Sequence, residues 1–125
     1  MTKIPEDVKN MIEKSIYLPM TLTVLNRDIS IIEQSPFKLK QPYLHLIEES
    51  LKLIQHDLYE VKRQLKKQHI SVSKVKSDEA FTLYSFLYQG FEEQHNYFNP
   101  RIRNRVSELM EGYLFKASST KFNNG

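Results

Sequence analysis

A regular apolar repeat between residues 44 and 65 constrains the fold of this chain more than any other feature. Its apolar side chains alternate spacings of three and four without interruption: Leu44, Ile47, Leu51, Ile54, Leu58, Val61 and Leu65. This is the heptad spacing of a helix that packs along one seam. The polar face begins with glutamates and ends with basic residues, the order that the helix macrodipole favours. We therefore predict a helix from Pro42 to about Gln68.

Two further segments carry helical spacing of apolar residues. The first runs from about Pro5 to Gln34 and contains Pro19 near its middle. Because proline removes a backbone hydrogen bond and clashes with the preceding turn, we expect a kink or a break there. The second runs from Ile102 to about Lys116, after a boundary at Asn99-Pro100.

The segment between residues 69 and 98 divides into two parts. From His69 to Ser77 the alternation of apolar and polar residues favours a short extended segment, for which no partner strand is evident. The run Ser77-Asp78-Glu79 then has the composition of a helix cap with an acidic first turn, so we predict a third helix to about Phe98. Its wide apolar face would consist of Phe81, Tyr84, Leu87, Tyr88 and Phe91.

Four amphipathic helices can bury their apolar stripes only against one another. We therefore expect an all-α fold, an antiparallel bundle of about four helices with the first kinked or broken at Pro19. Residues 1–117 would form a single helical-bundle domain, and residues 118–125 a flexible C-terminal tail. In the first connection, we expect Phe37 and Leu39 to fold back onto the core.

The residue inventory argues against catalysis. The 125 residues include no cysteine, no glycine-flanked serine and no glycine-rich phosphate loop, so we expect neither an enzyme nor a cofactor. The best metal candidates are Glu92 and His95, because a Glu and a His three positions apart on a helix can reach one ion. No second Glu-x-x-His is present. Solvated side chains, or side chains paired between helices, are the simpler interpretation.

Basic residues gather in two clusters. The first lies in the acid-free stretch from Val61 to Ser77 and consists of Lys62, Arg63, Lys66, Lys67, Lys74 and Lys76. The second, Arg101, Arg103 and Arg105, stands at the start of a helix, where the dipole disfavours cations by a few tenths to ~1 kcal/mol. Two explanations stay open. The arginines pair with Glu92, Glu93 or Glu108, or they bind an anionic partner through bidentate contacts.

Protein contacts are the function that the helical pattern favours most. We expect a non-enzymatic bundle that acts as a homo-oligomer or a small adaptor. The candidate interface residues are Leu44, Leu51, Leu58, Leu65, Tyr84 and Tyr88. The alternative is a nucleic-acid-associated regulator that binds through Arg101, Arg103 and Arg105 and through the Lys62–Lys76 stretch.

Three segments resemble a known family. They are Ile16-Tyr17-Leu18-Pro19, residues 34–40 (Gln-Ser-Pro-Phe-Lys-Leu-Lys) and residues 95–103 (His-Asn-Tyr-Phe-Asn-Pro-Arg-Ile-Arg). Together they are similar to a family of small uncharacterised Bacillus proteins known as YhjD-like. The resemblance covers most of the chain and implies a bacterial cytoplasmic protein, but no activity that could be assigned to a residue. A cytoplasmic location also fits the lack of an apolar run near the ~20 residues of a membrane span and of an export signal in Met1–Asp7.

Overall fold

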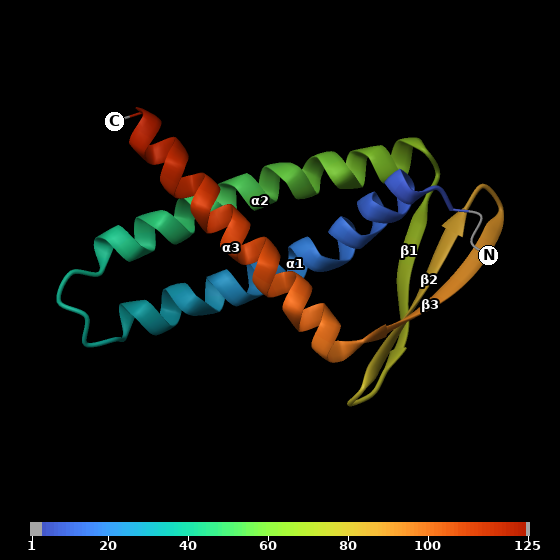
Figure 1. Cartoon of the computed structure of the whole chain (residues 1–125), viewed down its shortest axis with the longest axis horizontal. Helices are drawn as coiled ribbons and strands as arrows, with labels where there is room; N and C mark the ends of the chain where they lie inside the picture. Colours follow the sequence, from blue (N-terminus) through green and yellow to red (C-terminus); the bar gives the residue numbers. More distant parts are fainter. Residues whose placement is uncertain (1–3, 125) are drawn as a thin grey trace.

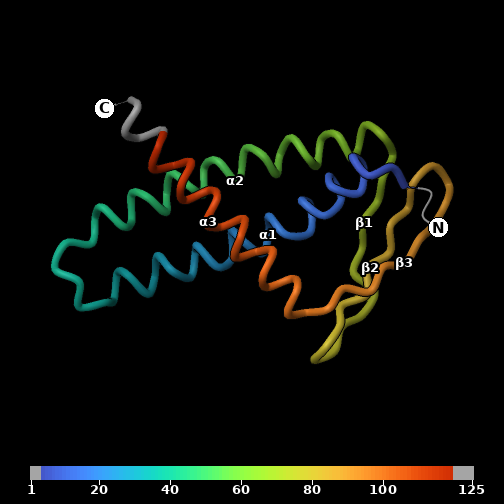
Figure 2. The backbone as a smooth tube through the Cα atoms, viewed as in Figure 1, coloured from blue at the N-terminus to red at the C-terminus, as the bar shows by residue number. Residues whose placement is uncertain are grey.

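Within residues 4–124, three helices and a three-stranded antiparallel sheet make up the fold (Figure 1). The computed structural model describes residues 4–124, and the side chains of residues 4–119. In chain order the elements are α1 (Glu6–Glu33), α2 (Gln41–Lys67), β1 (Ser71–Ser77), β2 (Phe81–Tyr88), β3 (Phe91–Phe98) and α3 (Asn99–Asn124). Helices α1 and α2 form a long hairpin that α3 crosses. The sheet lies where α1 begins and α2 ends, and the 34–40 connection lies at the opposite end (Figure 2).

Helices α1 and α2 confirm two of the predicted helices within one residue at each end. Of the predicted kink or break at Pro19, the break is wrong, because α1 is continuous from Glu6 to Glu33. Packing holds this helix together: Leu18 is completely buried, and the Thr21 hydroxyl donates a hydrogen bond of 2.9 Å to the carbonyl of Tyr17. Burying a leucine stabilises by roughly 1.5–3 kcal/mol, which offsets much of the ~3 kcal/mol that a proline costs inside a helix.

The apolar repeat of α2 packs inside the chain. Its leucines and isoleucines are buried, namely Leu44, Ile47, Leu51, Ile54, Leu58 and Leu65, and all but Leu44 belong to core clusters shared with α1 and α3. A second part of the core joins the start of α1 to the inner face of the sheet, where Phe86 is fully buried. Intramolecular packing therefore accounts for the heptad spacing, and a partner protein would meet other surfaces.

The predicted all-α bundle is wrong, because residues 81–98 form a β-hairpin where we predicted the third helix. A two-residue turn joins the strands, and both of its residues have positive φ, Gln89 at 50° and Gly90 at 82°. This is the turn geometry that matches the twist of paired strands, and glycine adopts it without strain. Along β2, Thr82, Tyr84 and Phe86 are buried while the residues between them are not. The strand thus buries alternate residues, whereas a helix would bury every third or fourth.

The predicted extended segment is confirmed as β1, and its partner is β2. Its register shifts between Lys74 and Lys76, so the two lysines flank a bulge on an edge strand. The loop from β1 to β2 contains the predicted helix cap, which instead closes a turn: Asp78 Oδ1 accepts hydrogen bonds of 2.8 Å from the amides of Ala80 and Phe81. Both bonds lower the pKa of the Asp78 carboxyl group, and the bond from Phe81 has the larger effect.

Helix α3 starts earlier and ends later than we predicted, and it runs from Asn99 to Asn124. Asn99 fixes its start, because its side-chain amide donates to the carbonyls of Asp78 at 2.9 Å and Glu79 at 3.1 Å. The helix passes through the boundary that we placed at residue 117, and Gly125 lies outside the described residues. The division into a domain and a tail stays a prediction. Within residues 4–124, no helix is both long and apolar enough to cross a bilayer.

Candidate functional site

A groove of about 780 Å³ lies between α1, the end of α2 and β1. Four of its lining side chains are lysine or histidine, and others supply hydroxyl groups and apolar surface. The lining comprises Lys62, Lys66, His69 and Lys74, then Ser15, Ser71, Ser73 and Tyr84, and then Ile16, Leu65, Ile70, Val72 and Leu87. None of these residues is acidic. We call this site the basic groove.

The end of α2 shapes one side of the basic groove. The amide of Ile70 donates to the carbonyl of Leu65 at 2.9 Å, and the amide of His69 donates to that of Lys66 at 3.1 Å. This is the Schellman pattern, whose turning residue is left-handed and usually glycine. Here His69 takes that position, with φ of 57°. Buried Leu65 and Ile70 then fix the direction in which β1 leaves the helix.

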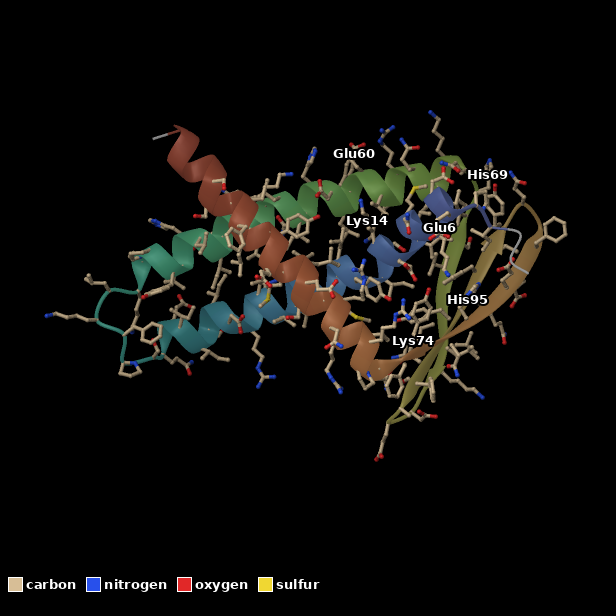
Figure 3. The ribbon with its side chains drawn as sticks, in the orientation of Figure 1. Glu6, Lys14, Glu60, His69, Lys74 and His95 are labelled. Atoms are coloured by element: carbon tan, nitrogen blue, oxygen red, sulfur yellow. The ribbon has the colours of Figure 1, made fainter. Side chains whose placement is uncertain are left out.

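The groove runs along β1, with His69 beside the start of the strand and Lys74 farther along it (Figure 3). Lys62 and Lys66 are one helical turn apart on α2, so they share a face. Lys74 stands opposite Tyr84 in the register of β1 and β2. Burial raises the pKa of Tyr84, whose hydroxyl group can donate a hydrogen bond. Ammonium and hydroxyl donors in one groove provide the chemistry for holding an anion.

The other basic residues of the first cluster lie outside the groove. Arg63 donates a hydrogen bond of 2.9 Å to Glu60 on the exposed side of α2. Lys67 is exposed and does not line the groove, and Lys76 lines a smaller cavity near Asp78. The structure thus selects Lys62, Lys66 and Lys74 from the basic stretch that the sequence singles out.

The arginine cluster is a separate feature. Arg105 pairs with Glu108 at 2.7 Å, which confirms one of the two explanations for that arginine. Arg103 lines an apolar groove of about 290 Å³ formed by α1 and α3, together with Met20 and Val106. This groove shares no lining residue with the basic groove. The two basic clusters therefore belong to different surfaces of the fold.

The metal candidates Glu92 and His95 do not come together. Because they lie three apart on β3 and not on a helix, their side chains point to opposite faces of the sheet. Glu92 accepts a hydrogen bond of 2.9 Å from Ser85, whereas His95 stacks on Phe86 and lies 3.0 Å from Glu93. Among the described residues, no three potential ligands stand close enough to share an ion.

A tyrosine cluster joins α1 to the sheet, and sequence patterns did not indicate it. The Tyr97 hydroxyl donates to Glu13 at 2.9 Å, and the Tyr97 ring makes edge contacts with Tyr17 and Tyr84. Burial is the main cause that raises the pKa of all three tyrosines, and for Tyr97 the bond to Glu13 adds to it. Tyr84 belongs to both this cluster and the basic groove, so the cluster braces one wall of the site.

Comparison with known proteins finds a family and a relative. The family described as "YhjD protein" matches residues 3–118. This chain belongs to that family. It is 51% identical over 115 residues to "Uncharacterized protein YhjD" of Bacillus subtilis (strain 168), which covers 92% of this chain and 96% of the relative. No solved structure matches. The resemblance carried by the three sequence segments is therefore confirmed.

The tyrosine cluster predicts how the stability of this YhjD-family protein depends on pH. Above pH ~10, a tyrosine with a raised pKa keeps its proton in the folded protein but loses it in the unfolded chain. The free energy of unfolding therefore falls by about 1.4 kcal/mol per pH unit for each such tyrosine. Tyr97→Phe removes one of these groups. We expect the free energy of unfolding of this variant to fall less steeply with pH than that of the wild type. Urea denaturation at several pH values from about 9 to 11, a range centred on the ordinary tyrosine pKa, measures the two slopes. Equal slopes would contradict the assignment.

Proposed function

We propose that this protein is a non-enzymatic binding protein that holds a phosphate-bearing ligand in the basic groove. One observation carries the proposal. Lys62 and Lys66 on α2 and Lys74 on β1 line the same groove, whose lining also includes hydroxyl-bearing residues and no acid. Such donors match the oxygens of a phosphate group, which accept charge-assisted hydrogen bonds.

The electrostatics of the groove favour a bound anion. Two lysines at i and i+4 repel each other by roughly 0.2–0.5 kcal/mol. The macrodipole offsets this for Lys66, which stands in the last turn of α2. It does not explain Lys74, which comes from a strand and adds a third ammonium group to the groove. An anionic ligand would relieve the repulsion among all three.

The floor of the groove indicates the rest of the ligand. Ile16, Leu65 and Val72 line it with apolar surface. Its volume of about 780 Å³ falls within the roughly 300–1,000 Å³ of small-ligand pockets. We therefore favour an elongated small molecule that combines phosphate groups with an apolar or flat portion, such as a nucleotide.

Binding of nucleic acid, our alternative from the sequence, is less well supported. It relied on the arginine cluster and the lysine stretch acting together, but Arg103 lines a groove that shares no residue with the basic groove. Contacts with a protein partner remain a prediction, and so does a cytoplasmic location. With the repeat of α2 buried, a partner would have to use another surface, for example the outer sheet face where Phe81 and Phe98 are exposed.

Calorimetric titration of the full chain with ATP, inorganic tripolyphosphate and adenosine tests the proposal. We expect ATP and tripolyphosphate to bind saturably at one site and adenosine to bind far more weakly, because the phosphates carry the charge. Affinity should fall gently with salt, since a few ammonium groups take part, whereas nucleic acid would show a steep dependence. The proposal fails if neither polyphosphate binds, or if adenosine binds as well as ATP.

A further inference from the structure

The connection between α1 and α2 exposes Phe37 and Leu39, which we expected to fold back onto the core, and that expectation is wrong. Leu39 is 72% exposed, Phe37 49% and Tyr43 52%. The rings of Phe37 and Tyr43, the latter in the first turn of α2, pack on each other with centroids 5.3 Å apart. We call residues 37–43 the hairpin tip. It lies at the end of the molecule farthest from the sheet (Figure 2).

Hydrogen bonds and prolines hold the hairpin tip in one conformation. The Ser35 hydroxyl donates to the carbonyl of Ile32 at 2.6 Å, and the Lys40 ammonium group donates to the carbonyl of Glu33 at 2.8 Å. Pro36, just before the tip, and Pro42, within it, restrict its backbone. A partner that meets these apolar side chains would therefore have little chain entropy to overcome.

The charges around the tip restrict the chemistry of that partner. Phe37-Lys38-Leu39-Lys40 alternates apolar and basic residues, and no acid occurs from Gln34 to Ile47. Lysine stems can lie along an apolar surface while their ammonium groups stay in water. The partner must then present a negative surface with an apolar layer directly beneath it. An anionic lipid leaflet has this arrangement.

We propose that the hairpin tip docks this protein on an anionic lipid surface. Phe37 and Leu39 enter the boundary between headgroups and acyl chains, Tyr43 lies at headgroup level, and Lys38 and Lys40 contact lipid phosphates. Aromatic rings and lysines are the side chains suited to that boundary. The contact is peripheral and reversible, because it buries a short loop and no spanning helix.

The chain itself supplies a convenient reporter, because it contains no tryptophan. In Leu39→Trp, the emission of the single tryptophan should shift to the blue with vesicles of phosphatidylcholine and phosphatidylglycerol, and much less with phosphatidylcholine alone. Tyr59→Trp, at an exposed site on α2, is the matched control and should not shift. A shift at both positions, or at neither, would overturn the proposal.

Sedimentation with the same vesicles tests the side chains in the otherwise native chain. We expect Phe37→Ser with Leu39→Ser to weaken binding by at least tenfold, and Lys38→Gln by roughly fivefold, since one basic residue near an anionic leaflet contributes about that much. Phe115→Ser, another exposed aromatic position, should leave binding unchanged. Lys66→Gln with Lys74→Gln should also leave it unchanged, which separates the tip from the basic groove.

Three results would contradict the lipid surface. The first is that the wild type does not sediment with anionic vesicles. The second is that Phe115→Ser loses as much vesicle binding as Phe37→Ser with Leu39→Ser. The third is that only Lys66→Gln with Lys74→Gln loses vesicle binding. Self-association that disappears in the Phe37→Ser, Leu39→Ser variant, without vesicle binding by the wild type, would assign the tip to a second copy of the chain and overturn the proposal.

Discussion

Replacing Lys66 and Lys74 together by glutamine is expected to weaken ATP binding by roughly tenfold or more. The two side chains line the basic groove from different elements, α2 and β1. A hydrogen bond to a charged group contributes about 1.5–3 kcal/mol, and 1.4 kcal/mol corresponds to a tenfold change in affinity. Glutamine keeps the approximate length and polarity of lysine, so the fold should tolerate both changes. The dissociation constant from calorimetry is the measurement.

Lys67→Gln with Lys76→Gln is the matched control for this variant. It removes the same charge from the same two elements, but Lys67 and Lys76 do not line the basic groove. If the lysines of β1 only protected an edge strand from pairing, the two variants would behave alike. We expect the control to bind ATP within about twofold of the wild type. Equal losses in the two variants would attribute binding to the general positive charge and not to the groove.

Phe86→Ala is expected to lower the free energy of unfolding by about 3–5 kcal/mol. Phe86 is completely buried on the inner face of β2, where it stacks on His95 with ring centroids 4.6 Å apart. Removing the ring leaves a cavity between the sheet and α1, and the loss is a large part of the 5–15 kcal/mol that stabilises a typical domain. Urea denaturation measures it directly.

Leu87→Ala, one residue along the same strand, should lower the free energy of unfolding by about 1 kcal/mol or less. Leu87 is 43% exposed, whereas its neighbour Phe86 is completely buried. On the helix that we predicted for this segment, Leu87 would lie in the apolar face and Phe86 would not. A larger loss for Leu87→Ala than for Phe86→Ala would therefore contradict the hairpin.

The hairpin was missed because its aromatic residues satisfy two periodicities at once. Tyr84, Leu87, Tyr88 and Phe91 have helical spacing, while Thr82, Tyr84, Phe86 and Tyr88 have the alternation of a strand. Tertiary packing decides between them, because only the strand buries Phe86 against α1. The sequence does contain one local signal for the hairpin, Gln89-Gly90 between the two aromatic runs. A two-residue turn ending in glycine is typical of hairpins.

The helical hairpin was predictable because its evidence is local. The repeat from Leu44 to Leu65 extends over several turns, so it indicates both the helix and its buried face. Pro19 misled the prediction of a break, since the effect of a proline depends on what packs around it. Burial of Leu18 and Leu25 on either side keeps α1 continuous.

The basic groove was predictable only in part. The acid-free stretch singled out Lys62, Lys66 and Lys74, but also three neighbours that lie elsewhere. Ser15 comes from a helix almost fifty residues earlier, and Tyr84 comes from the strand that we read as a helix. Their presence in the groove depends on the packing of α1 against the sheet, which no local pattern encodes.

Titration of isotope-labelled protein with ATP, followed by backbone amide chemical shifts, tests the central claim most directly. The basic groove predicts that the largest saturable shifts fall between residues 62 and 74, with further shifts at Ser15 and Tyr84. Shifts centred on residues 101–106, or small shifts spread over the whole surface, would contradict it.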